Sequence, residues 1–464
     1  MLTFQDFEKN RTPEFLMKAI QEHKSSELYK TARSADLYDR QRNETINEYV
    51  RMIFTLTGTP VEDFTASNNK IASNFFNRLN TQRCTYSLGN GITFTKKEGR
   101  VDEEGNSTVV DVTKEALGDQ FDTEMKEAGY LSLIHGVTFC FNNVDRIHVF
   151  PVTEFVPMWD EETGRLRAGI RFWQLDKDKP MVVVLYEEDG YTKYKTSGKI
   201  LRITDSKKKY KTTYQVVPST GDEDVVGEEN YGKLPIVPLW GSRLHQSTLV
   251  GMRQGIDSFD LIRSGFANDL TDCSQIYWIV ENCGGMTPEE LASFRDRLKI
   301  NHIAVADTDS GGKVTPYAQE IPYQARKEYL DHIRAGIYED FGGLDVHTVA
   351  AGATNDHINA AYQPLDENAD DFEFQISKCI KQILDLRGIE DTPIFKRNRV
   401  SNQLEQVQMV IAEAPYLDDE TILQKLPNIS PDEVKQILAR RDAEASNRME
   451  NDNPDDGPFG GGEG

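Results

Sequence analysis

The feature that most limits how this chain can fold is a long stripe of apolar residues in its second half. Apolar side chains recur there every three or four residues, at Ile256, Phe259, Ile262, Phe266, Leu270, Cys273, Ile276 and Val280. The mean interval is about 3.4 residues, close to the repeat of helices that pack along their length. Gly251 and Gly255 are small residues that would let a second helix approach closely. We therefore expect a helix over residues 246–281 that packs against another helix.

A second helix of this kind is predicted over residues 322–341, where apolar residues are four apart, at Tyr329, Ile333, Ile337 and Phe341. Between the two helices, Thr287-Pro288-Glu289-Glu290 has the pattern of a capping box with proline at the first helical position. The segments IAVA, DSGG and KVTPYAQEI that follow indicate a strand, a turn and a strand. Residues 282–321 are thus expected to form a small α/β unit between two helices.

The first half of the chain combines helical and β character. Residues 1 to about 80 are predicted to be helical, with an apolar stripe at Ile71, Phe75, Phe76 and Leu79. A short helix is expected from Thr113 to Gly129. From Leu131 to about Trp240, runs of β-branched and aromatic residues alternate with turn signals, which predicts an antiparallel meander. The fold class expected for the whole chain is α+β.

The C-terminal part begins with the weakly charged loop GGLDVHTVAAGATND. Asp356 can cap a long helix that runs through Leu386 and ends before Gly388. Pro364 lies inside this helix and should kink it, since an interior proline costs about 3 kcal/mol. PIFKRNRV indicates a short basic strand. Two further helices are expected over residues 401–448, the second starting at a capping box in Ser430-Pro431-Asp432-Glu433. Residues 449–464 lack apolar periodicity and are expected to be a disordered acidic tail.

The charge of the chain excludes some functions. Fifty-three Lys and Arg face 76 Asp and Glu, a formal charge of -23. Such a surface repels phosphate backbones, which disfavours a protein that reads DNA sequence but is compatible with one that DNA passes without adhering. The basic run Lys207-Lys208-Lys209 with Lys211 is expected to be a solvated hairpin edge rather than a nucleic-acid contact. The five cysteines are scattered without a CxxC pair, and neither a signal peptide nor an 18-residue apolar run is present, so we expect a reducing, aqueous compartment and no membrane.

Motifs for catalysis are missing. We find no P-loop, HExxH, GxGxxG after a strand, or GxSxG. Asp309-Ser310-Gly311-Gly312 resembles the nucleophile turn of trypsin-like proteases but lacks the other elements of such a site. Residues 307–311 begin like a calcium loop, yet Ala318 stands where a glutamate is required. We expect no catalytic residues, no cofactor and no metal. The open alternative is a hydrolase or metal enzyme with His347, Asp356 and His357 as ligands.

The order of these segments resembles the portal proteins of tailed bacteriophages, of the siphophage type. Each segment is a weak motif, and the resemblance rests on their order over roughly 380 residues. Pro364 and the tail after Ser446 depart from the family pattern. The segments that carry the resemblance are residues 68–95, 154–178 (EFVPMWDEETGRLRAGIRFWQLDKD), 232–242 (GKLPIVPLWGS), 255–282, 304–322, 325–341, 349–362 (VAAGATNDHINAAY) and 395–408.

The resemblance implies a portal-type subunit with a mixed α/β wing, a two-helix stem, a small α/β clip, a long tunnel helix and a helical crown. The expected boundaries are 1–245 for the wing, 246–281 and 322–341 for the stem helices, 282–321 for the clip, 342–356 for the tunnel loop, 357–400 for the tunnel helix and return strand, and 401–448 for the crown.

The resemblance also implies site residues. The tunnel loop would face DNA through Asp345, His347, Thr348, Val349, Ala350, Ala351, Thr354 and Asn355. The clip would meet an adaptor and the terminase through Glu289, Glu290, Arg295 and Arg297. Stem helices would pack through Ile256, Phe259, Phe266, Leu270, Ile333 and Ile337. A loop without DNA contact and a plain solvated clip helix stay open as alternatives.

The function implied is that of a structural ring of about twelve chains at the unique capsid vertex. The terminase motor packages double-stranded DNA through it, and DNA later exits by the same route. The implied partners are further copies of the chain, double-stranded DNA, the terminase large subunit, a head-completion adaptor, and the major capsid and scaffolding proteins. The chain would be assembled in the host cytoplasm and reside in the virion. The alternative is a capsid-associated scaffolding or interaction protein without a DNA pore.

Overall fold

The computed structural model describes residues 2–54, 58–64, 66–101, 107–198, 200–216, 223–272, 277–281, 287, 289–290, 313–317, 322–345 and 355–399, with short pieces between 410 and 441. The chain forms two compact units. The first consists of residues 1–344 and 364–398, and the second of residues 345–363 and 399–464. Helices and antiparallel sheets make up the described residues, which confirms the α+β class.

The N-terminal part begins with four helices, α1 (Phe4–Lys9), α2 (Pro13–Ser25), α3 (Glu27–Asp39) and α4 (Glu44–Glu48). The side chains of Thr3, Thr12 and Ser26 cap the first three by accepting a backbone N–H. The prediction of helix up to residue 80 is confirmed through α4 and again from Phe75, but it is wrong for the described residues between Tyr49 and Asn74. Strands β1 (Met52–Phe54) and β2 (Pro60–Glu62) follow, and α5 (Phe75–Leu88) begins only after a non-helical segment that contains Ile71.

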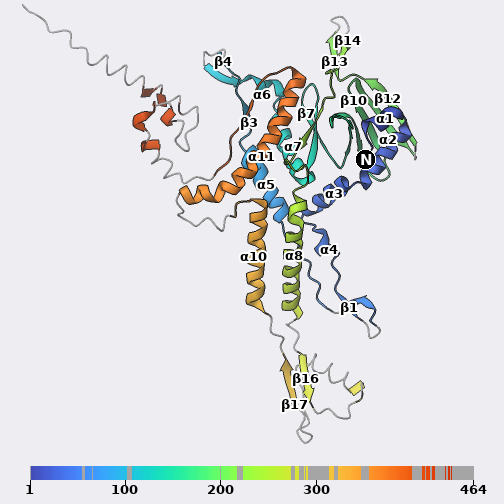
Figure 1. Ribbon diagram of the computed structural model, residues 1–464, viewed down its shortest axis with the longest axis vertical. Coiled ribbons are helices and arrows are strands. Elements are labelled where there is room, and N and C mark those ends of the chain that lie inside the picture. The colour runs from blue at the N-terminus through green and yellow to red at the C-terminus, as the bar shows by residue number, and fades with distance from the viewer. Residues whose placement is uncertain are drawn as a thin grey trace, which may run out of the picture. The chain divides into compact units, whose positions relative to one another are not determined.

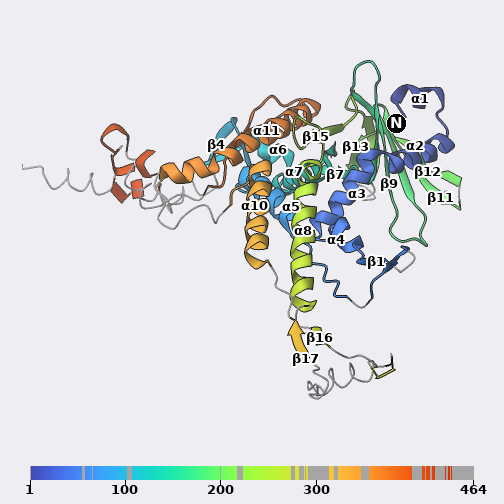
Figure 2. The ribbon, with the colours of Figure 1, turned by 60° about the horizontal axis from the view of Figure 1, so that its bottom comes forward.

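The antiparallel meander predicted from Leu131 to about Trp240 is confirmed for five strands: β8 (Phe155–Trp159), β9 (Leu166–Trp173), β10 (Val182–Glu187), β11 (Gly190–Ser197) and β12 (Ile200–Lys208). The strands before and after them in that range lie in other sheets. Helices α1 and α2 cover one face of this sheet (Figures 1 and 2), where Phe15, Leu16 and Ile20 pack against Ile170 and Leu185. The basic run predicted as a hairpin edge lies on and just after β12, which is the edge strand.

A three-stranded sheet links the meander to the helices, in the order β15 (Ile236–Trp240), β6 (Val137–Asn142) and β7 (Ile147–Pro151). Every residue of β6 is buried because both of its faces are covered. Phe139 and Phe141 contact the meander, whereas Cys140 faces the cluster formed with α7 (Phe121–His135) and α11 (Asn355–Arg387). This strand therefore joins two hydrophobic clusters into one body.

The predicted helix from Thr113 to Gly129 is in fact two helices. Helix α6 (Val112–Leu117) ends at Gly118, whose φ of 95° interrupts the helix, and α7 then continues to His135. The smaller strand pairs are β3 (Ile92–Phe94) with β18 (Pro393–Phe395), β4 (Lys97–Val101) with β5 (Ser107–Asp111), and β13 (Lys211–Val216) with β14 (Glu223–Glu229). Strand β18 confirms the strand predicted in PIFKRNRV.

Helix α11 confirms the long helix predicted after the weakly charged loop. It contains Pro364 and stops before Gly388, which has a φ of 70°. The boundary between the two compact units falls at Pro364. The helices predicted for residues 401–448 lie mostly outside the described residues. One of the short described pieces is a 3₁₀ turn at Ala414–Tyr416.

Two helices run side by side in both ribbon views, α8 (Leu249–Asp272) and α10 (Tyr323–Phe341) (Figures 1 and 2). Beyond them lie β16 (Tyr277–Glu281) and β17 (Lys313–Tyr317), which pair in antiparallel register. The prediction of helix through Val280 is therefore wrong in its last part, because residues 277–281 are a strand. Their β-branched and aromatic side chains fit a strand as well as a helical stripe, and pairing with β17 decides between them. The predicted strand in KVTPYAQEI is confirmed for Lys313–Tyr317.

Candidate functional site: the paired helices and the root of the following loop

Helices α8 and α10 are joined by apolar side chains within one chain. Gly255 is where they approach closely, since a side chain there would meet Ile337 at 3.1 Å. Phe75, at the start of α5, packs edge-on against Phe259 of α8 and Tyr338 of α10, with ring centroids 5.0 and 6.1 Å apart. The predicted helix–helix contact is thus formed between these two helices.

Of the six predicted stem residues, four contribute to this internal packing. Ile256 and Ile337 are buried in the cluster, and Phe259 and Ile333 pack against it. Phe266 lies near Tyr323, with centroids 5.7 Å apart. Leu270 differs from the others because 55% of it is exposed. Packing between neighbouring chains stays a prediction, and Ile256 and Ile337 have almost no surface left for it.

A second face of α8 is polar and holds an extended segment of the chain, residues 69–73. The backbone N–H groups of Asn69, Ile71 and Ser73 donate to the side chains of Asn268 (2.6 Å), Ser264 (3.0 Å) and Asp260 (2.9 Å). Two residues of extended chain span about 6.6 Å and four residues of helix rise about 6.0 Å, so the two repeats match. We call this set of three hydrogen bonds the polar ladder.

The ladder ends at a buried carboxylate. Asp260 is 0% exposed and also accepts from the side chain of Asn43. Its pKa is raised because burial disfavours the charged form more than these hydrogen bonds favour it. One turn earlier, Asp257 accepts from Thr45 at 2.7 Å and from the Tyr38 hydroxyl. Burial and that hydrogen bond raise the pKa of Tyr38 to about 12.

Sequence reasoning missed the ladder, although its signal was present. Asp260, Ser264 and Asn268 recur every four residues beside the apolar stripe of the same helix. Short polar side chains at this interval within an otherwise apolar helix indicate a face that accepts hydrogen bonds. What the sequence did not show was the segment that donates them, which is about 190 residues away.

The loop after α10 starts from a fixed root. Gly342 ends α10 with a φ of 64°, and a side chain there would collide with the Asn368 amide. The Gln82 amide clamps Leu344 from both sides: its nitrogen donates to the Leu344 carbonyl and its oxygen accepts from the Leu344 N–H, each at 2.9 Å. Arg83 donates to the Phe341 carbonyl at 3.0 Å, and Asn368 donates to the same oxygen at 3.0 Å.

Arg83 is buried and lies with its guanidinium 4.3 Å from the centroid of the Phe341 ring. Burial lowers the pKa of Arg83 to about 10. Side chains of α5 and α11 therefore fasten the backbone up to Leu344. Of the predicted tunnel-loop residues, Asp345 is half-buried just after this root and Asn355 begins α11. The others, His347, Thr348, Val349, Ala350, Ala351 and Thr354, lie outside the described residues.

The predicted capping box at Thr287 is confirmed. The Glu290 carboxylate accepts from the Thr287 N–H at 2.9 Å, and the Thr287 hydroxyl accepts from the Glu290 N–H at 3.3 Å. The backbone hydrogen bond of Thr287, ahead of the side-chain bond, lowers the pKa of Glu290. Glu289 and Glu290 are exposed, and the predicted contact residues Arg295 and Arg297 lie outside the described residues.

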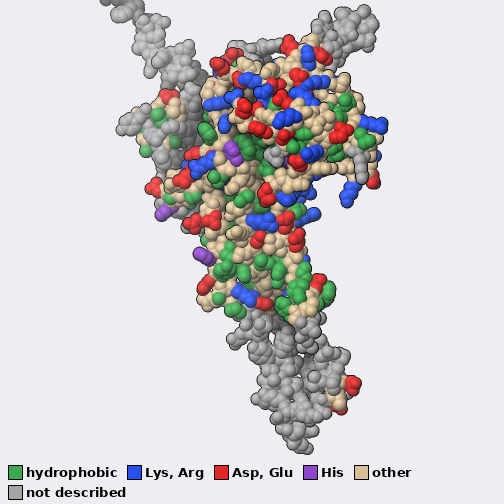
Figure 3. Space-filling model, turned by 45° about the vertical axis from the view of Figure 1, so that its right-hand side comes forward, with side chains coloured by type: hydrophobic (Ala, Val, Ile, Leu, Met, Phe, Trp, Pro, Cys, Tyr) green, Lys and Arg blue, Asp and Glu red, His purple; other side chains and the backbone are tan. Residues whose placement is uncertain are grey.

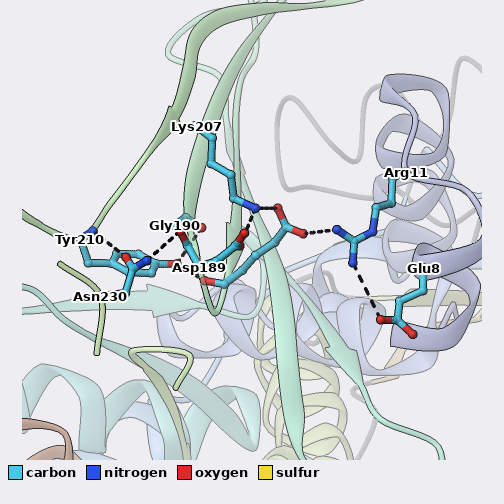
Figure 4. Close-up of polar contacts among 8 residues, drawn as sticks. Glu8, Arg11, Asp189, Gly190, Lys207, Tyr210 and Asn230 are labelled. Atoms are coloured by element: carbon cyan, nitrogen blue, oxygen red, sulfur yellow. Dashed lines mark hydrogen bonds and ion pairs between the residues drawn. The ribbon is translucent and has the colours of Figure 1, made fainter. Parts of the chain in front are cut away.

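Two lysines of the basic run, Lys207 and Lys208, are paired with carboxylates. Lys207 pairs with Glu187 at 2.9 Å and with Asp189, and Arg11 contacts Glu187 at 3.2 Å. Figure 4 shows Lys207, Asp189 and Arg11 in this network. Burial lowers the pKa of Lys207, but hydrogen bonds to Asp189 and Glu187 outweigh it, so the pKa is raised overall. Tyr210 donates to the Glu187 carbonyl at 2.6 Å in the same network. These pairings support a hairpin edge rather than a nucleic-acid contact.

Within the described part of the chain, no three His, Cys, Asp or Glu side chains gather as a metal site would require. His357 and Asp356 are exposed there, and His347 lies outside it. No helix among the described residues is long and apolar enough to span a membrane. Figure 3 shows acidic and basic side chains interspersed over the upper part of one face, and hydrophobic ones gathered lower down.

Comparison with known proteins places these features in a family. The model of a family described as phage portal protein, SPP1 Gp6-like, matches residues 18–447. A portal protein of Clostridium phage phiCD119 is 25% identical over 389 residues, covering 78% of this chain and 82% of that protein. A portal protein of Bacillus phage SPP1 is 23% identical over 462 residues, covering 94% of this chain and 87% of that protein.

Proposed function

This chain belongs to the SPP1 Gp6-like family of phage portal proteins, and from that membership we propose that it forms a ring through which double-stranded DNA enters and leaves the phage head. Proteins of this family are structural components of the phage particle. The observation that carries the proposal is the extent of the family match, residues 18–447, which includes the paired helices and the loop after them. We propose about twelve copies in the ring.

The paired helices support this role because a conduit needs a wall that keeps its shape. Internal packing of Ile256 and Ile337 leaves α8 and α10 stable as a pair, and the polar ladder holds residues 69–73 along α8. The fixed root at Leu344 then sets where the loop over residues 345–354 begins. In our proposal this loop lines the tunnel.

The charges of the chain support a surface that DNA passes without binding tightly. With a charge of -23, the chain repels DNA at long range. Two of the four lysines in the basic run, Lys207 and Lys208, are paired with Glu187, Asp189 and Asp205. A tunnel loop that carries no Lys or Arg between residues 342 and 356 would add no salt-dependent brake on moving DNA.

We also propose which proteins the ring would bind. The exposed Glu289 and Glu290 lie in the segment between the paired helices and would meet the terminase large subunit during packaging and a head-completion adaptor afterwards. The capsid and scaffolding proteins would surround the ring at one vertex of the head.

Electron microscopy of the purified full chain tests the ring directly. We expect annular particles, with a mass by native mass spectrometry close to twelve chains. Only monomers and dimers under all assembly conditions would contradict the proposal.

A packaging assay separates the conduit from a scaffolding protein without a pore. Replacing residues 346–354 by an equal number of Gly and Ser keeps the root at Leu344. We expect rings to form and DNA packaging to fall, whereas unchanged packaging would favour the scaffolding role.

A further inference from the structure

We propose that residues 49–54 and 58–64, which we call the arm, dock onto the paired helices α8 and α10 of the next copy in the ring. The inference rests on the proposed ring and names the surfaces that would hold neighbouring copies together. It concerns contacts outside the internal cluster that binds α8 to α10 within one chain.

The arm exposes large apolar side chains that its own chain leaves uncovered. Strands β1 and β2 pair only with each other among the described residues, with Ile53 opposite Val61. Phe54 is 75% exposed and Phe64 is 84% exposed, and Met52 is also exposed. An isolated two-stranded hairpin is marginally stable in water, so contact with another surface would stabilise it.

The root of the arm is nevertheless held firmly. After the arm, the polar ladder fixes residues 69–73 on α8, and before it Thr45 and Asn43 bond Asp257 and Asp260 of the same helix. The two sides are tied to each other because the Lys70 ammonium donates to the Asn47 carbonyl at 2.6 Å. The arm is thus presented from a fixed place beside α8, as the ribbon views show (Figures 1 and 2).

A receiving surface lies on the paired helices of the same chain. A groove of about 750 Å³ runs between the start of the arm, α8 and α10. Its lining combines apolar residues, among them Leu261, Ile262 and Tyr329, with the ion pair of Arg326 and Asp269. Its floor includes Gly265, where a side chain would meet open space. The exposed Leu270 and Tyr323 lie farther along the same two helices.

A second copy of this chain is the occupant that these surfaces fit. In a closed ring every interface joins two different surfaces, so each copy must carry both a projecting and a receiving one. The arm and the groove are such a pair, because each presents apolar side chains next to α8. A symmetric contact of arm with arm would instead give dimers, since it uses one surface twice.

Two variants separate the surfaces without disturbing the chain itself. Replacing Phe54 and Phe64 together by Ser removes the two most exposed rings of the arm, and Gly265→Trp fills the groove from a position that has free space. Leu175→Ser is the control for the arm, because Leu175 is 89% exposed elsewhere. Gly251→Trp is the control for the groove, because it also points into open space on α8 and does not line the groove.

The measurement is the chain concentration at which half of the protein is in rings, by mass photometry, with circular dichroism as the check of folding. We expect both test variants to raise this concentration by at least about tenfold, as loss of buried aromatic contacts does. The two controls should assemble like the wild-type chain. Either test variant assembling as well as wild type overturns the inference.

Mixing the two test variants provides the sharper result. The groove of the arm variant is intact, as is the arm of the groove variant, so an equimolar mixture should give one-to-one heterodimers and no rings. Absence of heterodimers would overturn the inference even if each variant is impaired alone. If the wild-type chain forms no rings, the proposed function itself is contradicted. If the wild-type chain forms rings and the arm variant assembles equally well, only the proposed docking of the arm is contradicted.

Discussion

At the scale of single residues, Asp391 shows how one carboxylate can hold several segments together. Its oxygens accept from the backbone N–H groups of Thr95 and Lys96, each at 3.2 Å, and from the Thr113 hydroxyl. Thr95 and Lys96 directly follow β3 and Thr113 belongs to α6, whereas Asp391 itself lies just before β18. Burial raises the pKa of Asp391, but the hydrogen bonds outweigh it and lower the pKa to about 2.

We predict that Asp391→Ala lowers the melting temperature by about 2–4 °C at pH 7, as the loss of about 1 kcal/mol does. Because the folded-state pKa lies below the usual aspartate pKa of 3.8, this stabilisation is present above pH 4 and is lost as the pH falls through 2. Thermal unfolding of wild type and variant between pH 7 and pH 2 measures it. The difference should shrink toward pH 2, and a constant difference would contradict the role of the charge. Asp178→Ala, an exposed turn residue, is the control.

The buried Asp260 has the opposite shift. Since burial raises its pKa, the folded state binds a proton more readily than the unfolded chain does. Its contribution to stability is therefore largest below the ordinary aspartate pKa and decreases as the pH rises. Two aspartates of one chain thus respond to acid in opposite directions because of their surroundings.

At the scale of elements, the polar ladder couples an extended segment to a helix through matched repeats. We predict that Ser264→Ala destabilises the protein by about 1 kcal/mol, since the Ile71 N–H loses its acceptor. Ser258→Ala in the same helix changes helix propensity equally and should be neutral within about 0.5 kcal/mol. Denaturant unfolding gives the energies. Faster hydrogen exchange of the Ile71 amide in the Ser264 variant alone would locate the effect, and equal exchange in both would contradict it.

The root of the loop is a second element-scale device. We predict that Gln82→Leu speeds hydrogen exchange at Leu344 by about tenfold, because the Leu344 N–H loses the acceptor that holds it. Exchange at Ile337, inside α10, should be unchanged and serves as the internal control. Equal protection of Leu344 in both proteins would show that Gly342 and Arg83 suffice to fix the root.

At the scale of the whole molecule, the charge and the loop together decide how DNA would pass. We predict that Val349→Lys lowers packaging several-fold and that the loss is greatest at low salt, because a ring would carry about twelve added charges toward the phosphates. Val349→Thr is the matched neutral control. Electron microscopy should show normal rings for both variants. Normal packaging by the lysine variant at all salt concentrations would mean that the loop does not contact DNA.

Much of the architecture follows from local patterns. The meander, the capping box at Thr287 and the helix from Asn355 to Arg387 were predictable because alternation, caps and the 3.6-residue repeat are properties of neighbouring residues. The errors fell where partners distant in sequence decide the structure. Residues 277–281 form a strand because β17 pairs with them, and Ile71 is not helical because α8 supplies Ser264 to its N–H.

The sequence by itself determined the fold class, the two packed helices, the order of segments typical of the family and the net charge of -23. Which side chains are buried, held in place or left exposed depends on the tertiary structure. Ile256 and Ile337 are buried within one chain, and Gln82 and Arg83 hold the root of the loop. Phe54 and Phe64 remain exposed. The physical reason is that periodicity shows which side of an element is apolar, whereas burial depends on what packs against that side from elsewhere in the chain.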